Sequence, residues 1–210
     1  MGLLSALFGN GHQTPEVKFW KWFRANSVQL FNAPTAANHA FDQLKNELNK
    51  VWAGLTFEIS RIENGKRELV ISADGNRKAF PAVKCLVAAA PSMSNWYVTA
   101  FRPREPKSLS IDMGGIKLGP EDIWFAAKPA ASGHGIDLAF AVRGMTQQNT
   151  RKYMPAVIIL MDAAIGEYDA VMKVRGIRPM KLPEDPAGTG LHPFTSLPTL
   201  IDEVVVEPNA

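Results

Sequence analysis

The sequence predicts an α+β fold in which an antiparallel or mixed sheet has helices on both faces. Two stretches of helical periodicity open the chain and predict an N-terminal helical hairpin. The dipeptide Asn64-Gly65 then marks a β-hairpin. The order hairpin, helix, strand also occurs twice, over residues 56–102 and 122–174. We therefore expect two hairpin–helix–strand units in addition to the helical hairpin.

The length and composition are those of an ordinary globular protein. The chain has 210 residues, of which 46% are hydrophobic and 20% charged, so it can bury a core without disulfides or metal. A single α+β domain is predicted over residues 14–181. An arm at 1–13 precedes it, and an irregular proline-rich tail at 182–210 is expected to pack on it.

The first helix is expected to begin after Thr14 and to end at about Phe31. Thr14 is a favourable N-cap, Pro15 suits the first helical position, and Glu16 places an acid in the first turn. A second helix follows, with an amphipathic stripe. The apolar residues of that stripe are Phe41, Leu44, Leu48, Val51 and Leu55.

The hairpin at Asn64-Gly65 is predicted to turn in type I′ geometry. That register places Glu63 opposite Lys66 and Arg61 opposite Glu68, two favourable cross-strand pairs. Both faces of the hairpin are apolar, so both should be covered. The apolar residues are Phe57, Ile59 and Val70 on one face and Leu69 and Ile71 on the other.

The remaining elements are predicted from apolar runs and from Gly and Pro breakers. In chain order they are a helix at 81–90, a strand at 96–102, a small hairpin at 109–118, a strand pair at 122–127 and 136–142, a helix at 155–165 and a strand at 168–174. The helix at 155–165 should end at Gly166.

An internal duplication is a hypothesis raised by the two apolar helices. Residues 80–91 align without gaps with residues 154–165 and match at six of twelve positions. Both helices are rich in Ala, Val and Leu, and this shared composition alone is the alternative explanation. A duplication predicts the same strand order in both units, one continuous sheet, and a groove where the units meet.

Motifs for common chemistries are missing from the sequence. The four histidines are isolated, without H-E-x-x-H or a Cys/His cluster. There is no phosphate-binding glycine loop and no G-x-S-x-G sequence. We therefore predict no metal and no cofactor.

The lone cysteine, Cys85, lies in an apolar run and is expected to act as a small buried hydrophobe. One cysteine fits a reducing compartment. The net charge of +3 argues only weakly for anionic partners. No apolar stretch approaches the ~20 residues that a membrane span needs.

The first helix carries the first set of candidate binding residues. Its four aromatics cannot all lie on one apolar stripe, so either the helix is covered on two sides or an aromatic is exposed. Exposed aromatics beside cations suit a protein interface or single-stranded nucleic acid. The alternative is core aromatics with snorkelling lysines. The candidates are Phe19, Lys21, Trp22 and Arg24, together with the neighbouring Trp20 and Phe23.

A second set of candidates is Asp162, Arg102 and Arg104. Asp162 lies in the most apolar helix, and a buried carboxylate there needs either an ordinary structural partner, such as an arginine, or a functional role. Arg102 and Arg104 follow the end of a predicted strand. Glu167 and Asp169 flank the next turn and are expected to be solvated.

Several motifs together resemble an uncharacterised bacterial family of hypothetical proteins with a domain of unknown function. The motifs lie within residues 16–175 and include Trp20-Lys-Trp-Phe23, Phe57-Glu-Ile59, the run Gly65 to Gly75, Phe80-Pro-Ala-Val83, Ala100-Phe-Arg-Pro-Arg104, Pro120-Glu-Asp-Ile-Trp-Phe125 and the run Asp162 to Asp169. The resemblance implies a bacterial, intracellular setting. It implies no activity, cofactor or catalytic residue.

The sequence favours a non-enzymatic protein that binds another protein, located in the cytoplasm. The alternative is an enzyme of unknown reaction whose site lies in the groove between the two repeated units. Nucleic acid is a disfavoured partner, because Lys and Arg never form a run of four or more.

Overall fold

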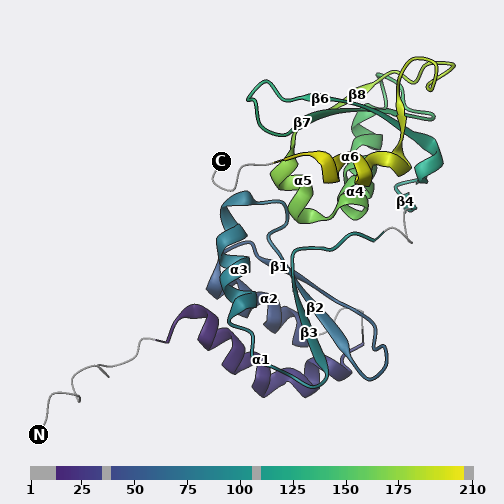
Figure 1. Ribbon diagram of the computed structural model, residues 1–210. Coiled ribbons are helices and arrows are strands. Elements are labelled where there is room, and N and C mark those ends of the chain that lie inside the picture. Colours follow the sequence, from purple (N-terminus) through teal and green to yellow (C-terminus); the bar gives the residue numbers. More distant parts are fainter. Residues whose placement is uncertain (1–12, 35–38, 106–109, 206–210) are drawn as a thin grey trace, which may run out of the picture. The chain divides into compact units, whose positions relative to one another are not determined.

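The structure is a computed structural model that describes residues 13–34, 39–105 and 110–205 (Figure 1). Most of the predicted N-terminal arm, residue 109 of the small hairpin and the end of the tail lie outside these ranges. The chain divides into two compact units: unit 1 comprises Met1–Asp74 and Lys78–Ala100, and unit 2 comprises Gly75–Arg77 and Phe101–Ala210. The α+β class is confirmed. The single domain at 14–181 stays a prediction.

Unit 1 contains the predicted helical hairpin and the first hairpin–helix–strand repeat. Thr14 Oγ1 accepts a hydrogen bond from the backbone N–H of Val17 (3.4 Å), which confirms the predicted start of the first helix. The elements are α1 (Pro15–Asn32), α2 (His39–Val51), β1 (Thr56–Ile59), β2 (Arg67–Ser72), a 3₁₀ turn (Arg77–Ala79), α3 (Phe80–Ala88) and β3 (Trp96–Ala100). The sheet has the order β1-β2-β3, antiparallel between β1 and β2 and parallel between β2 and β3.

The β1–β2 hairpin turns at the predicted dipeptide, but part of its predicted register is wrong. Glu63 does pair with Lys66, whereas Ser60 rather than Arg61 lies opposite Glu68. The Ser60 N–H donates to the Glu68 carbonyl (3.0 Å), and Ser60 Oγ accepts from the Glu68 N–H (2.8 Å). These two bonds leave one extra residue on the first strand, which is a β-bulge.

The bulge moves the apolar residues of β1 relative to those of β2. Phe57 and Ile59 lie opposite Ile71 and Leu69, not on the same face as Val70 as predicted. Residues 69–72 are all buried, so β2 is covered on both of its faces, as expected.

The aromatic cluster of α1 belongs to the core of unit 1. Phe19, Trp20 and Phe23 are buried, and the Trp20 indole N–H donates to the Leu86 carbonyl of α3 (2.7 Å). Trp22 is only partly exposed. Of the two alternatives for this helix, cover from two sides is the one observed for Phe19, Trp20 and Phe23, because α1 packs on both α2 and α3.

Unit 2 contains the small hairpin, the second repeat and the tail. Its main sheet has the order β8-β7-β6-β9, and β4 pairs only with β5. The elements are β4 (Ile111–Met113), β5 (Ile116–Leu118), β6 (Ile123–Pro129), β7 (Ile136–Val142), α4 (Thr150–Ile165), α5 (Glu167–Lys173), β8 (Val174–Met180), β9 (His192–Pro193) and α6 (Leu197–Glu203), with 3₁₀ turns at Pro120–Asp122 and Phe194–Ser196. Phe125, Phe140, Leu160 and Phe194 contribute to its buried core.

Two predicted segments of unit 2 need correction. Residues 168–174 were expected to form a strand, but α5 occupies 167–173 and the strand begins at Val174. Gly166 (φ +79°) ends α4 and starts α5, whose acidic first turn and final Lys173 suit the helix dipole. The tail is not wholly irregular, because α6 packs there with buried Leu197 and Ile201.

The two repeats share a strand order but not a sheet. In each, an antiparallel hairpin is followed by a helix and by a strand that pairs in parallel with the second hairpin strand. The orders β1-β2-β3 and β6-β7-β8 are thus equivalent, as the duplication predicts. The prediction of one continuous sheet is wrong, since the strands belong to separate sheets, and the hypothesis of a groove formed by such a sheet loses its premise.

Candidate functional site

A groove on unit 2, with a volume of about 540 Å³, is the principal candidate site. One wall is the connection from β7 to α4, and the other is the end of β8. The lining residues are Met145, Thr146, Gln147 and Thr150 on the first wall and Pro179, Met180 and Lys181 on the second. Two methionines and a proline offer apolar contact, while the threonines, the glutamine and the lysine offer hydrogen bonds and positive charge.

Asn149 and Thr150 hold the first wall in place. Asn149 Oδ1 accepts from the Thr146 N–H (2.6 Å), and Asn149 Nδ2 donates to the Gly144 carbonyl (3.0 Å). Thr150 Oγ1 donates to the Thr146 carbonyl (2.8 Å). Gly144 has φ +78°, and a Cβ there would lie 2.8 Å from the Tyr153 hydroxyl, so the turn needs a glycine.

The second wall is the end of an edge strand. β8 pairs with β7 in parallel, with Pro179 beside Phe140 and Met180 beside Ala141. Gly176 allows the close approach to β7, because a Cβ there would lie 2.7 Å from Asp137 Oδ1. The position of this wall therefore follows from the register of the β7–β8 pair.

The two segments around the groove are basic and contain no acid. Residues 143–153 carry three Lys or Arg side chains and residues 170–181 carry four, without any Asp or Glu. Arg143 and Lys173 are occupied by Asp122 and Asp169, at 3.5 and 3.2 Å. Four exposed cations have no side-chain hydrogen bond or ion pair with any residue that the structure describes: Arg151, Lys152, Arg178 and Lys181.

The start of α4 adds to the positive character of the groove. Arg151 and Lys152 lie in its first turn, where the helix dipole favours acids. Asn149, the N-cap residue, makes no side-chain bond to the helix, because its amide is engaged in the loop. The positive end of α4 thus lies beside two cations and contributes to the first wall through Thr150.

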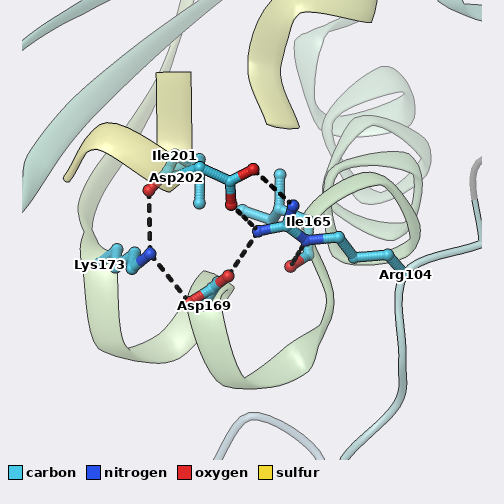
Figure 2. Close-up of polar contacts among 6 residues, drawn as sticks. All are labelled: Arg104, Ile165, Asp169, Lys173, Ile201 and Asp202. Atoms are coloured by element: carbon cyan, nitrogen blue, oxygen red, sulfur yellow. Dashed lines mark hydrogen bonds and ion pairs between the residues drawn. The ribbon is translucent and has the colours of Figure 1, made fainter. Parts of the chain in front are cut away.

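Arg104, a predicted site residue, is part of an internal ion-pair network (Figure 2). Its guanidinium bonds both carboxylate oxygens of Asp202 (2.6 and 3.2 Å), Asp169 (2.6 Å) and the Ile165 carbonyl (3.0 Å). Lys173 joins Asp169 at 3.2 Å. The hydrogen bonds to Asp202 raise the pKa of Arg104, and the same bonds lower the pKa of Asp202 from its ordinary value. The network attaches the segment at Arg104 to α5 and α6.

Arg102 and Asp162, the other two predicted site residues of this unit, contact each other. Arg102 Nε lies 2.9 Å from Asp162 Oδ2, which is the structural partner that one of the two interpretations of Asp162 required. Glu167, expected to be solvated, is instead fully buried and accepts from the backbone N–H groups of Arg102 (3.1 Å) and Gly75 (3.3 Å). Asp169, also expected to be solvated, is ion-paired. These groups fix the backbone of unit 2.

The predicted residues of α1 lie beside a smaller hollow on unit 1, of about 350 Å³. Lys21 and Arg24 line it, whereas Phe19 lies in the core and Trp22 is not part of the lining. The lining residues are Val17, Trp20, Lys21, Arg24, Ala89 and Pro91. Ala89 is the C-cap of α3, and cations beside a helix C-terminus have a structural role in balancing its dipole.

Two further observations concern metal and thiol chemistry. Cys85 is exposed on α3, so its predicted role as a buried hydrophobe is wrong; the inward positions of this helix are taken by Val83 and Leu86. Among the described residues, His, Cys, Asp and Glu form no group of three or more that could hold a metal ion.

The sequence alone does not predict the groove, because its two walls are 29 or more residues apart along the chain and carry no motif. The signal that could have found it is the lack of acids over residues 143–153 and 170–181. In comparisons with known proteins, no family model, curated protein or solved structure matches the chain. None of the helices in the described ranges combines the length and apolarity that a membrane span requires.

Proposed function

We propose that the chain is a non-enzymatic binding protein and that the groove on unit 2 takes an anionic ligand with an apolar part. The observation that carries the proposal is Lys181, a lining cation without a partner among the described residues, in a groove with apolar Met145, Met180 and Pro179. Three further cations without such a partner follow or precede lining residues along the chain: Arg151, Lys152 and Arg178. Unpaired cations that surround an apolar surface favour a ligand of opposite charge that can also bury apolar atoms.

The helix start at α4 supports the same proposal. Positive side chains in the first turn of a helix cost stability, typically about 0.3–1 kcal/mol each. Arg151 and Lys152 occupy this unfavourable place. Departures from local preference are expected at functional sites, where binding rather than folding decides the residue type.

The internal ion pairs of unit 2 also support a binding site in the groove. They already engage the predicted site residues of this unit, Arg102, Arg104 and Asp162. Released for ligand binding, Arg104 would give up its bonds to Asp169 and Asp202. The groove cations give up no such bond.

The proposal is tested with anilinonaphthalene sulfonate, a fluorescent probe that is both anionic and apolar. Lys181→Glu should weaken its binding about tenfold, because the substitution reverses one charge at the wall of the groove. Lys45→Glu is the matched control: Lys45 is exposed on α2 of unit 1, and its reversal changes the net charge equally. Equal affinities for the two variants would reject the groove as the binding site.

A further inference from the structure

We infer that the ligand of the groove is an acidic, extended segment of another protein, which adds as a strand to the outer edge of β8. This inference rests on the proposed function, because it names the partner of the same groove. Three features of β8 support it: its open edge, its exposed second half and its positive charge.

β8 is the long open edge of the main sheet of unit 2. It has seven residues and, within the part of the chain that the structure describes, pairs with β7 alone, whereas the opposite edge strand, β9, has two residues. An edge strand presents unpaired backbone N–H and C=O groups, which an extended peptide can use to join the sheet. Pro179 has no N–H, so the donors of this edge come from the other residues of β8. The edge leads directly into the groove, since Pro179 and Met180 belong to both.

The second half of β8 is uncovered on its faces as well. Ile177, Arg178 and Pro179 are exposed in succession, and Ile177 is 36% exposed. Successive residues of a strand point to opposite faces of a sheet. A strand added here would therefore meet side chains on both faces, with Ile177 as an apolar contact.

The charge of the edge selects an acidic partner. Arg175 and Arg178 lie on β8, and Lys181 follows at the groove. Arg175 bonds the His134 carbonyl, which leaves its positive charge uncompensated. The acids that flank β8 along the chain are Asp169, which pairs with Arg104 and Lys173, and Glu184, which lies beyond the groove lining. On the neighbouring strand, Asp137 lies opposite Gly176 and pairs with Lys128 at 3.8 Å. Ile177 and Arg178 point to opposite faces, so a strand that alternates an acid with an apolar residue can place the acid beside Arg178 and the apolar residue beside Ile177.

The groove and the edge favour a peptide over nucleic acid. The lining residues of the groove include no aromatic ring on which a base could stack. The directional N–H and C=O groups of a strand edge match another peptide backbone. Nucleic acid remains a distinct outcome of the test.

The test uses the full chain and a ten-residue peptide of alternating Glu and Val, with binding measured by calorimetry. Two modified peptides carry N-methyl groups on alternate residues, one set on the Glu residues and the other on the Val residues. A strand that joins one edge uses the N–H groups of only one set, so one modified peptide should lose about tenfold or more in affinity and the other about twofold. Hydrogen exchange of residues 174–180 should slow on binding the unmodified peptide.

The outcomes separate the inference from the proposed function. Equal loss, or no loss, with both methylated peptides overturns strand addition, while the sensitivity of the sulfonate probe to Lys181→Glu is a separate result on the groove. Arg178→Glu should weaken the peptide about tenfold, with Lys45→Glu as the control within about twofold. Tighter binding of a thymidine oligonucleotide than of the peptide, lost in salt, would also overturn the inference.

Discussion

Unit 1 and unit 2 both use arginine to hold distant segments together, but the partners of the arginines differ. Arg67 of β2 is 2% exposed, and its side chain makes four hydrogen bonds to backbone carbonyls. Three of these carbonyls, from Leu30, Phe31 and Ala33, belong to the end of α1. Arg102 and Arg104 of unit 2 are about one quarter to one third exposed and bind carboxylates.

The difference follows from desolvation. Burial lowers the pKa of Arg67 from its ordinary value, and the negative end of the α1 dipole and its four acceptors compensate the buried charge. Where water still reaches the guanidinium, as at Arg104, the chain uses carboxylates, whose attraction is screened by salt. Unit 1 should therefore be insensitive to salt and unit 2 sensitive to it.

The largest effect is expected at Arg67. Arg67→Ala should destabilise unit 1 by about 3 kcal/mol or more, because it removes the donor from four backbone carbonyls, two of them at buried bonds and two at partly buried ones. Urea unfolding followed by tryptophan fluorescence checks this, since four of the five tryptophans lie in unit 1. Arg61→Ala, at an exposed arginine of the same hairpin, should change stability by less than about 0.5 kcal/mol. If the loss of stability caused by Arg67→Ala became smaller in high salt, the expected difference in salt sensitivity between unit 1 and unit 2 would be contradicted.

The next effect is expected at Glu167, the buried carboxylate of unit 2. Glu167→Ala should cost about 1–3 kcal/mol, because the N–H groups of Gly75 and Arg102 lose their acceptor. Glu167→Gln keeps one acceptor oxygen and should cost less. Thermal unfolding followed by circular dichroism ranks the two variants; equal losses would mean that the hydrogen bonds are not what Glu167 contributes.

A smaller effect, with a dependence on salt and pH, is expected at Arg104. Arg104→Ala should lower the melting temperature by less than Glu167→Ala does, and the difference from wild type should shrink in roughly 0.5 M salt. The lowered pKa of Asp202 means that its contribution is present above the ordinary aspartate range and is lost as the pH falls below about 4. The stability gap between Arg104→Ala and wild type should therefore narrow at acid pH without closing, because the bond from Arg104 to the Ile165 carbonyl does not titrate. A gap of unchanged size there would contradict the role of Asp202.

Local signals explain which parts of the fold the sequence predicts. The cap at Thr14 and the turn at Asn64-Gly65 depend on neighbouring residues, and the structure confirms both. The wrong prediction of a strand at 168–174 also comes from a local signal. A short apolar run is compatible with either a strand or a helix, and here the residues after Gly166 form a helix. The bulge at Ser60 involves a hydrogen bond to the Ser60 hydroxyl, and the alternation of apolar and polar residues along a strand does not predict such a bond.

Long-range contacts explain why the site was only partly predictable. Asp162 is a predictable candidate because a charge in an apolar helix needs a partner, but only the structure identifies Arg102 as that partner. Asp202 lies 98 residues from Arg104 along the chain, and no local pattern connects the two. The groove likewise joins a loop and a strand end that only the parallel pairing of β7 and β8 brings together.

The smallest effect is expected where the two units differ in how a helix begins. α1 starts with a bonded Thr14 cap and Glu16, whereas α4 starts without a bonded cap and with Arg151 and Lys152. Arg151→Glu and Lys152→Glu should each stabilise the protein by about 0.3–1 kcal/mol, because they place an acid at the positive end of the α4 dipole.

The same two substitutions should weaken binding of the anionic probe, since they remove positive charge beside the groove. Lys18→Glu is the matched control, because Lys18 lies in the first turn of α1: it should stabilise to a similar degree and leave binding unchanged. Melting temperature and probe affinity, measured on all three variants, separate the two roles. If Arg151→Glu or Lys152→Glu changed neither the melting temperature nor the probe affinity, the cations at the start of α4 would neither destabilise the helix nor contribute to binding.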